Sequence, residues 1–330
     1  MYISHDTLDD LLNEVFERLL NEKQLFQASR GRFTELYGYC LHLKNPRARL
    51  SRSEGKGKVF SALGELLWYL SGDTRLDFID YYVPQRFQKE SDDQVRVRSG
   101  YGKRLSSFRG MNQLQNVIRV LRERPTSRRA VVQLFDATDL ECHYASIPCT
   151  CTLQFMARDG CLHLFVSMRS NDAYIGLPHD VFAFTMLQEL VARCVDMEIG
   201  EYKHCAGSLH LYEEHMKSAA SYLEEGWQAS ISMPAMPIGE PWSSVGKLQQ
   251  IEEALRTGKE VDIQQALLDE YWKDLARLLA AYHAWKERDA QLLSKLMTEM
   301  HSDVYKMFIQ ARADRLTSPD WREIPAGELQ

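Results

Sequence analysis

The chain has 330 residues, 45% of them hydrophobic and 26% charged, which is enough to bury the core of one large domain or two modest ones. Its formal net charge of -6 argues against nucleic acid as a partner, because such chains usually carry a basic patch, but it leaves a small anionic ligand open. No segment reaches the ~18 apolar residues of a membrane span, and the N-terminus lacks the features of a signal peptide, which predicts a cytoplasmic protein without membrane contact.

The seven cysteines are odd in number and scattered, which favours reduced thiols over a disulfide framework. Cys149 and Cys151 have C-x-C spacing, but no second Cys/His pair at zinc-finger spacing accompanies them. No metal site is therefore expected.

In the first half of the chain, apolar residues at helical spacing predict an amphipathic helix over 6–24. Residues 28–38 are interpreted as a loop that leads into a strand, and Gly55 and Gly57 bound another loop. A mostly buried helix is predicted over 59–71, ended by Gly72 and Asp73. Its single carboxylate is Glu65. This residue either has a function in the site, or it caps a helix or belongs to a buried ion pair.

Further along, the patterns predict a helix over 113–123, a buried strand over 130–135 and a β-hairpin with strands over 152–156 and 161–168. After Gly176-Leu177-Pro178 comes a long apolar helix from Val181 to Val195. Three prolines between 234 and 241 mark a linker, and the pattern from 248 to about 315 is helical. We therefore expect an α/β domain with a mixed sheet over 1–225, and a helical extension over 245–318 packed on or near it.

Cys149 follows Pro148 beside a predicted strand, where a free cysteine is usually a small buried hydrophobic residue. Three arginines in loops at strand boundaries favour a functional role, since their guanidinium groups suit phosphate and would lower the pKa of a nearby thiol. These are Arg128, Arg129 and Arg169.

Seven strings resemble the thymidylate synthase family in order and spacing: GELLWYLSGDT, GYGK, PTSRRAVVQLFD, IPC, LQF, RSNDAYIGLPHD and HLYEEH, between residues 64 and 215. The resemblance implies an α/β fold, a nucleoside monophosphate substrate and 5,10-methylenetetrahydrofolate as the one-carbon donor. It also implies a homodimer in which each active site takes two arginines from the other subunit.

For the reaction, the resemblance implies that Cys149 adds to C6 of the pyrimidine and so makes C5 nucleophilic. Glu65 would organise proton transfer and water at the ring, and Tyr101 would belong to the same hydrogen-bond network. Phosphate binding within the subunit would fall to Arg169 and Ser170.

The remaining expected contacts also come from the resemblance. Arg128 and Arg129 match the pair given to the other subunit, and His210 and Tyr212 match the contacts to the sugar 3′-hydroxyl. Asp172, Phe87 and His179 fall at positions near the folate. The early loop departs from the family pattern, so Arg30 and Arg32 remain rival phosphate ligands.

The main departure from thymidylate synthases is Asp180, where those enzymes have an asparagine that recognises uracil. A carboxyl group that accepts from N4–H and, when protonated, donates to N3 fits cytosine instead. Aspartate at this position resembles the CMP and dCMP hydroxymethylases of the family, in which water captures the exocyclic methylene. The alternative is that Asp180 only caps a helix before Val181.

Other departures agree with this branch. Phe87 stands where a tryptophan is usual, Thr150 replaces the histidine after the nucleophile, and His179 replaces an aromatic residue. The C-terminal WREIPAGELQ lacks the short apolar tail of the synthases. The sequence thus predicts a cytidylate 5-hydroxymethyltransferase; a methylating synthase acting on dUMP and an inactive nucleotide-binding scaffold remain alternatives. The choice between CMP and dCMP stays open, as does the pathway, whether nucleoside-antibiotic biosynthesis or modified phage DNA.

Overall fold

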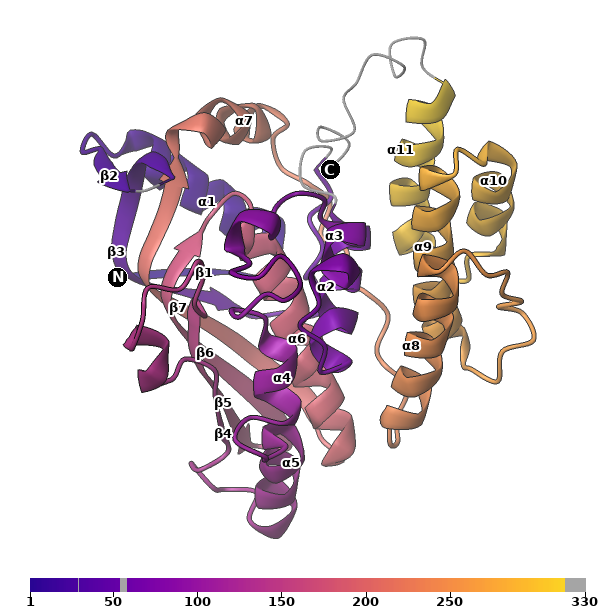
Figure 1. Ribbon diagram of the computed structural model, residues 1–330, viewed down its shortest axis with the longest axis horizontal. Coiled ribbons are helices and arrows are strands. Elements are labelled where there is room, and N and C mark those ends of the chain that lie inside the picture. Colours follow the sequence, from indigo (N-terminus) through magenta and orange to yellow (C-terminus); the bar gives the residue numbers. More distant parts are fainter. Residues whose placement is uncertain (29, 54–57, 318–330) are drawn as a thin grey trace.

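The computed structural model describes residues 1–28, 30–53 and 58–317. Its described strands form one mixed sheet in the order β1-β3-β7-β6-β5-β4, with β2 paired to β3 (Figure 1). The β1/β3 and β6/β7 pairs are parallel and the others antiparallel. The predicted α/β class is confirmed. The strands are β1 (Tyr2–His5), β2 (Phe26–Ala28), β3 (Gly31–Leu43), β4 (Val131–Gln133), β5 (Thr150–Arg158), β6 (Cys161–Asp172) and β7 (Glu198–Tyr212).

The described helices lie before, between and after these strands. They are α1 (Leu8–Asn21), α2 (Val59–Leu70), α3 (Leu76–Tyr82), α4 (Tyr101–Ser106), α5 (Gln113–Glu123), α6 (Gly176–Cys194), α7 (Glu213–Glu224), α8 (Trp242–Arg256), α9 (Glu270–Lys286), α10 (Ala290–Glu299) and α11 (Lys306–Thr317), with short 3-10 turns at Gln88–Glu90, Ala137–Leu140 and Asp303–Tyr305. None of these helices is long and apolar enough to cross a membrane.

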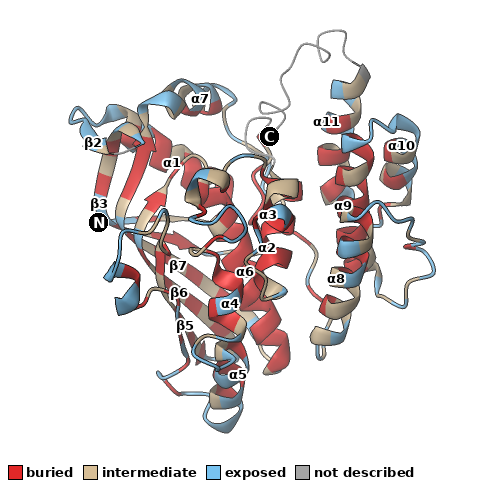
Figure 2. Ribbon diagram, in the orientation of Figure 1, coloured by how far each residue is buried: buried red, intermediate tan, exposed pale blue. Residues whose placement is uncertain are grey.

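The two faces of the sheet differ in burial, as the alternation along β5 shows. Leu153 and Phe155 are fully buried toward the helices, whereas Thr152, Gln154 and Met156 are only partly buried. Strand side chains alternate between faces, so one face forms the core under the helices and the other stays partly open (Figure 2).

The region 28–38, expected to be a loop, is largely strand β3, and that expectation was wrong. Phe33 to Leu43 pairs with Tyr202 to Tyr212 of β7, so a long-range partner rather than local composition determines the conformation. The loop expected around Gly55 and Gly57 lies outside the described residues, as does the C-terminal WREIPAGELQ.

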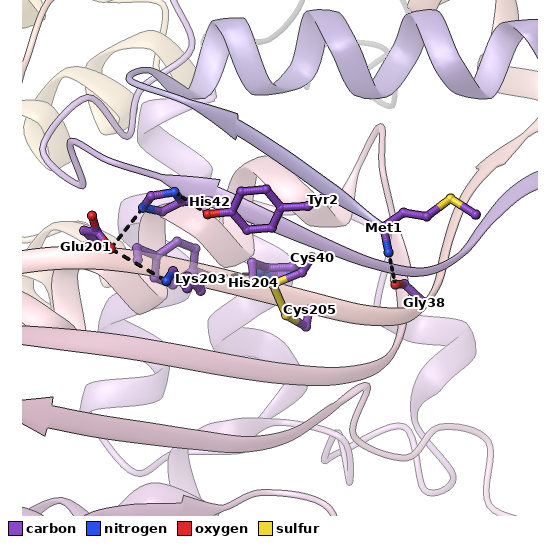
Figure 3. The surroundings of a disulfide bond; sticks show 10 residues. Met1, Tyr2, Gly38, Cys40, His42, Glu201, Lys203, His204 and Cys205 are labelled. Atoms are coloured by element: carbon purple, nitrogen blue, oxygen red, sulfur yellow. Dashed lines mark hydrogen bonds and ion pairs between the residues drawn. A yellow bond between two sulfur atoms is a disulfide. The ribbon is translucent and has the colours of Figure 1, made fainter.

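The expectation that all cysteines are reduced was also wrong. Cys40 of β3 and Cys205 of β7 are direct cross-strand neighbours, with Cα atoms 4.0 Å apart, and form a disulfide (Figure 3). Tertiary pairing alone creates this bond, because 165 positions separate the two residues. The remaining five cysteines are free thiols.

Helix α6 begins at Gly176, earlier than expected, so Gly176-Leu177-Pro178 forms its first turn. Proline is tolerated there because first-turn N–H groups have no partner within the helix. Asp180 consequently lies inside the helix, and the N-cap position is Ile175. The alternative that Asp180 is a helix cap is wrong.

The C-terminal helices pack on α2 and α3 through aromatic side chains. Tyr282 of α9 stacks on Tyr82 at 5.3 Å between ring centroids and donates its hydroxyl to the backbone oxygens of Tyr81 and Tyr82. Gly64 in α2 allows this packing, because a Cβ there would lie 2.2 Å from the Tyr82 ring. The extension therefore shares the hydrophobic core of the rest of the chain.

Candidate active site

Cys149 lies immediately before β5 and next to Arg169 of β6. The Arg169 guanidinium donates from Nη2 to Cys149 Sγ at 3.6 Å and is itself held by the carbonyl oxygens of Pro148 (3.0 Å) and Ile147 (3.1 Å). Burial raises the pKa of the Cys149 thiol more than Arg169 lowers it, which corrects the expectation of a net decrease. Arg169 is thus positioned to stabilise the thiolate that forms during reaction.

Tyr101, at the start of α4, is hydrogen-bonded to Thr150, the residue after Cys149. Its hydroxyl accepts from the backbone N–H of Thr150 at 3.2 Å and from the Thr150 hydroxyl at 2.8 Å. Because Thr150 is fully buried, water does not compete for these two hydrogen bonds, and they hold the Tyr101 hydroxyl in place. The pKa of Tyr101 is raised well above its usual value by burial and by the nearby Asp180 and Cys149, so the phenol stays protonated.

Glu65 lies in the middle of α2 and is buried. Its Oε1 accepts from the Tyr69 hydroxyl at 2.5 Å, while Oε2 is buried without a hydrogen-bond partner among the described residues. Burial raises the pKa of Glu65. The structure shows neither a capping role nor an ion pair for this carboxylate in the described part of the chain, so an unsatisfied oxygen remains for a ligand or water.

Arg86 is a charged residue of the site that the sequence did not reveal. Its side chain stacks over Phe87 at 5.2 Å, and within the described chain its buried Nη1 has no hydrogen-bond partner. Its positive charge favours the ionised forms of Glu65 and Asp180. The loop after α3 has no motif that would have pointed to it, because only the fold brings it to the carboxyls.

Asp180 is anchored by a buried chain of polar groups. Asn171 donates from Nδ2 to Asp180 Oδ2 at 2.7 Å, and its Oδ1 lies 3.0 Å from His204 Nε2, whose Nδ1 lies 2.8 Å from the Tyr202 hydroxyl. Burial lowers the pKa of His204 to about 3, so the ring is neutral. Since an amide oxygen only accepts, the neutral His204 must donate from Nε2 to Asn171 Oδ1. His204 Nδ1 then accepts from the Tyr202 hydroxyl.

The protonation of Asp180 follows from its surroundings. Burial and the negative charge of Glu65 raise its pKa to about 8. The carboxyl is therefore largely protonated at neutral pH. With Oδ2 accepting from Asn171, the proton is available on Oδ1, so one carboxyl can both donate and accept.

The expected sugar and phosphate ligands gather at the ends of β3, β6 and β7. His210 is buried, packs edge-on against Tyr212 at 5.0 Å and pairs in register with Asp172, while Ser170 is two residues back along β6. Arg30 pairs with Glu90 and its charge also acts on Cys149 and Tyr212, whereas Arg32 pairs with Glu213 at 2.6 Å on the surface. Of the two rival arginines, the structure brings Arg30 toward the cysteine.

Arg128 and Arg129 lie in the exposed turn before β4, and the structure does not bring them to Cys149 of the same chain. Ser127 caps this turn by accepting from the backbone N–H of Arg129 at 3.1 Å. Both guanidinium groups are thus presented outward.

The three residues expected near the folate have different environments. Asp172 accepts from the backbone N–H groups of Tyr174 and Ile175 at 2.8 and 3.0 Å, which holds the turn into α6. His179 lines a pocket of about 570 Å³ and lies 2.9 Å from the Ser61 hydroxyl. Phe87 is instead packed in the core, 5.6 Å from Trp68. In the described chain, no cluster of three His, Cys, Asp or Glu residues is arranged to hold a metal ion.

The site thus combines a cysteine beside an arginine, two carboxyls and a pocket at one end of a mixed sheet, an arrangement suited to covalent catalysis on a small anionic substrate. Residues 55–254 match the family model of thymidylate synthase, which is more than half of the chain, and the protein belongs to the thymidylate synthase family. This family uses methylenetetrahydrofolate as its one-carbon donor.

A similar protein is the thymidylate synthase of Buchnera aphidicola subsp. Baizongia pistaciae (strain Bp), which is 31% identical over 160 residues. The match covers 47% of this chain and 60% of the relative's length.

Proposed function

We propose that the protein is a cytidylate 5-hydroxymethyltransferase that converts CMP or dCMP, methylenetetrahydrofolate and water to the 5-hydroxymethyl nucleotide and tetrahydrofolate. The observation that carries this proposal is the pairing of Asp180 with Asn171. With Oδ2 held as an acceptor and the proton on Oδ1, the carboxyl offers a donor for N3 and an acceptor for N4–H of cytosine. Uracil would place its N3–H and O4 against the wrong partners.

Cys149 starts the reaction by forming a bond from Sγ to C6 of the ring, and electron density moves to C5. Arg169, whose Nη2 lies 3.6 Å from the sulfur, is positioned to stabilise the thiolate before addition. Bound methylenetetrahydrofolate supplies the carbon that joins C5.

The proton on C5 must then leave, and water must add to the exocyclic carbon. Two buried polar atoms have no hydrogen-bond partner in the described chain: the acceptor Glu65 Oε2 and the donor Arg86 Nη1. A water molecule could donate to Glu65 Oε2 and accept from Arg86 Nη1. Glu65 takes the proton from C5 through this water, and the bond between the transferred carbon and the folate nitrogen would then break, leaving an exocyclic methylene on C5. The oxygen of a water would bond to that methylene, the protons lost from C5 and from this water would pass to the folate nitrogens, and the electron pair returned to the ring would expel the Cys149 sulfur. When Cys149 leaves C6, the aromatic ring and the free thiolate are restored.

The pocket next to His179 fits the donor chemically. Aromatic side chains and cations line it, which suits a flat ring system with a carboxylate tail. Arg30, Arg169 and Ser170 would bind the 5′-phosphate, and His210 with Tyr212 the sugar hydroxyl.

The active form in this proposal is a homodimer that pairs through the partly open face of the sheet. The outward-facing Arg128 and Arg129 would then reach the phosphate in the other subunit. An Arg128→Ala/Arg129→Ala chain mixed with a Cys149→Ala chain should regain activity in hybrid dimers, since one of the two sites is then complete. A mixture that stays inactive although hybrids form would contradict shared sites.

The direct test is incubation with methylenetetrahydrofolate and each of CMP, dCMP, UMP and dUMP, with products identified by mass. We expect addition of CH2O to a cytosine nucleotide. Addition of CH2 to dUMP, with dihydrofolate as the second product, would instead identify a methylating synthase. Binding without any product in all four would favour the inactive scaffold.

A further inference from the structure

Glu65 and Tyr69 form a short hydrogen bond on helix α2. The two residues are four positions apart, which places their side chains on the same face of the helix. The Tyr69 hydroxyl donates to Glu65 Oε1 at 2.5 Å, a length typical of hydrogen bonds from hydroxyl groups to ionised carboxylates. Both residues are buried, so water does not compete for this bond. The contact therefore fixes one of the two carboxylate oxygens.

The second oxygen of the carboxylate is left open. Glu65 Oε2 is buried and has no hydrogen-bond partner in the part of the chain that the structure describes. The terminal torsion of a glutamate is broad, so a carboxylate with neither oxygen fixed could turn either one toward the site. Because Tyr69 holds Oε1, the oxygen available to a water or a substrate atom is Oε2.

The hydrogen bond also favours the charged form of the carboxylate. Burial raises the pKa of Glu65, while the charge of Arg86 and the hydrogen bond from Tyr69 lower it. The pKa of Tyr69 itself is raised well above its usual value, by burial and then by the charge of Glu65, so the phenol stays protonated and remains a donor. Tyr69 thus supports the ionised Glu65, which is the form that can accept a proton.

The charged groups around Glu65 come from other parts of the fold. Arg86 lies in the loop after α3, and Glu90, in the 3-10 turn that follows, raises the pKa of Glu65. Burial and then the charge of Glu65 raise the pKa of Asp180 on α6. Tyr69 is a neutral member of this group, so replacing it by phenylalanine removes a hydrogen bond without removing a charge.

The ring of Tyr69 is held by its neighbours. Its centroid lies 5.0 Å from that of Tyr101 and 5.7 Å from that of Trp68. Tyr101 is in turn fixed by Thr150, the residue after Cys149. A side chain whose rotamer is set by packing can hold another group in place, so the Tyr69 hydroxyl is prearranged for Glu65.

We propose that Tyr69 is a positioning residue of the reaction: its hydroxyl holds Glu65 Oε1 and so keeps Oε2 free to take up the C5 proton through a water. This inference deepens the proposed function and rests on it for the role of Glu65 as a base. It gives a role to a tyrosine that is expected to contact neither the nucleotide nor the folate.

Tyr69→Phe tests the proposal, because it removes the hydroxyl and keeps the packed ring. Tyr305→Phe is the matched control: Tyr305 is fully buried, and its hydroxyl has no hydrogen-bond partner among the described residues. The activity measured is exchange of the C5 hydrogen by the full-length protein. Exchange needs addition of Cys149 to C6, gain and loss of a proton at C5 and departure of Cys149, but no one-carbon donor. CMP, dCMP, UMP and dUMP are each tested, and the nucleotide that wild-type protein exchanges fastest is used.

Tyr69→Phe should lower kcat for exchange about threefold to tenfold near pH 6 and leave KM for the nucleotide unchanged, since no contact to the substrate is lost. The lower limb of the pH profile should move to higher pH by about half a unit to one unit, so the loss becomes smaller as pH rises. The upper limb should stay in place, whereas loss of the Arg86 charge should move both limbs. Tyr305→Phe should match wild type.

Infrared spectroscopy measures the pKa of Glu65 without substrate. The carboxylate band is isolated as the difference between each protein and its Glu65→Gln counterpart, and it should titrate at higher pH in Tyr69→Phe than in wild type. An unchanged titration would overturn the proposal, as would a lower kcat with an unshifted pH profile, which would make Tyr69 a packing residue.

The exchange assay also separates this proposal from the proposed function. If wild-type protein exchanges the C5 hydrogen and then yields a methylated product, the proposed function fails and the role of Tyr69 is still decided by the pH profile and the infrared titration. If wild-type protein exchanges none of the four nucleotides, both proposals are overturned.

Discussion

The side-chain amide of Asn171 donates to Oδ2 of Asp180 at 2.7 Å, and this bond connects strand β6 to helix α6. Because Asn171 is itself held by His204, the carboxyl cannot rotate freely. The arrangement leaves Oδ1 as the atom that carries a proton when Asp180 is neutral. In the proposed function, selection of the base would therefore depend on Asn171 and His204 as well as on Asp180.

Asp180→Asn should shift preference from cytosine to uracil nucleotides. The amide exchanges donor and acceptor, so the cytosine nucleotide is left with an unpaired buried group at a cost of about 1–3 kcal/mol. We expect the cytosine-to-uracil ratio of kcat/KM to fall at least about tenfold. Competition assays with both nucleotides in the same variant would measure this, and an unchanged ratio would remove the main support for the hydroxymethylase branch.

Asn171→Leu should weaken selection of cytosine through Asp180, because Asn171 positions that carboxyl and is not itself proposed to contact the substrate. The change leaves Asp180 Oδ2 and His204 Nε2 without their partners, so the carboxyl becomes free to rotate. We expect kcat/KM for the cytosine nucleotide to fall about tenfold or more while Cys149 remains able to exchange the C5 hydrogen. Asn116→Leu, on the exposed side of α5, is the control. Wild-type selectivity in Asn171→Leu would mean that the relay is only structural.

The pKa of Asp180 predicts a pH-dependent effect on stability. In the unfolded chain the carboxyl ionises near pH 4, but in the folded protein it keeps its proton up to about pH 8. Folding therefore takes up a proton in this window, and the wild type loses stability as pH rises through it. Asp180→Asn should be no more stable than wild type at pH 4 and more stable at pH 8, by at most roughly 5 kcal/mol.

Denaturant titrations across pH 4–8 would measure this difference for Asp180→Asn. Asp6→Asn, at a carboxylate whose side chain is 68% exposed, should show no such trend. A constant difference between wild type and Asp180→Asn at all pH values would contradict a protonated Asp180.

Cys149→Ala and Cys149→Ser should abolish both turnover and exchange of the C5 hydrogen with solvent, because both need a sulfur bonded to C6. The fold and nucleotide binding should persist, as measured by circular dichroism and calorimetry. Cys151→Ala, two residues further along the chain and within β5, should remain active. Substantial turnover in Cys149→Ala would rule out the mechanism.

Arg86→Leu should shift the pH profile as well as lower the rate. The guanidinium lowers the pKa of both Glu65 and Asp180, so its removal should raise both and move the limbs of the kcat/KM profile to higher pH. We expect a loss of about tenfold to a hundredfold at pH 7, largely recovered in Arg86→Lys. Arg119→Leu on the exposed face of α5 is the matched control. A lower rate with an unshifted profile would show that Arg86 acts only by packing.

Local sequence patterns were sufficient to predict several helices and strands and the residue types of the site. The helix predicted over 113–123 coincides with α5, and the hairpin around Asp159 and Gly160 is present, because their periodicity and turn residues act within a few positions. The order of motifs around Cys149 identified the family, since residue types that touch a substrate can be recognised without knowing the contacts.

Features that depend on residues far apart in the chain could not be predicted and follow from the fold. Residues 31–38 become strand by pairing with β7, and Cys40 meets Cys205 through the same pairing. Arg86 is placed beside Glu65 and Asp180 by the packing of α2, α3 and α6, and the pocket exists because α9 and α11 dock on that surface. Burial also raises the pKa of Asp180, because removal from water penalises its charge. An aspartate that would be ionised in an unfolded chain can therefore keep its proton and act as a hydrogen-bond donor in the folded protein.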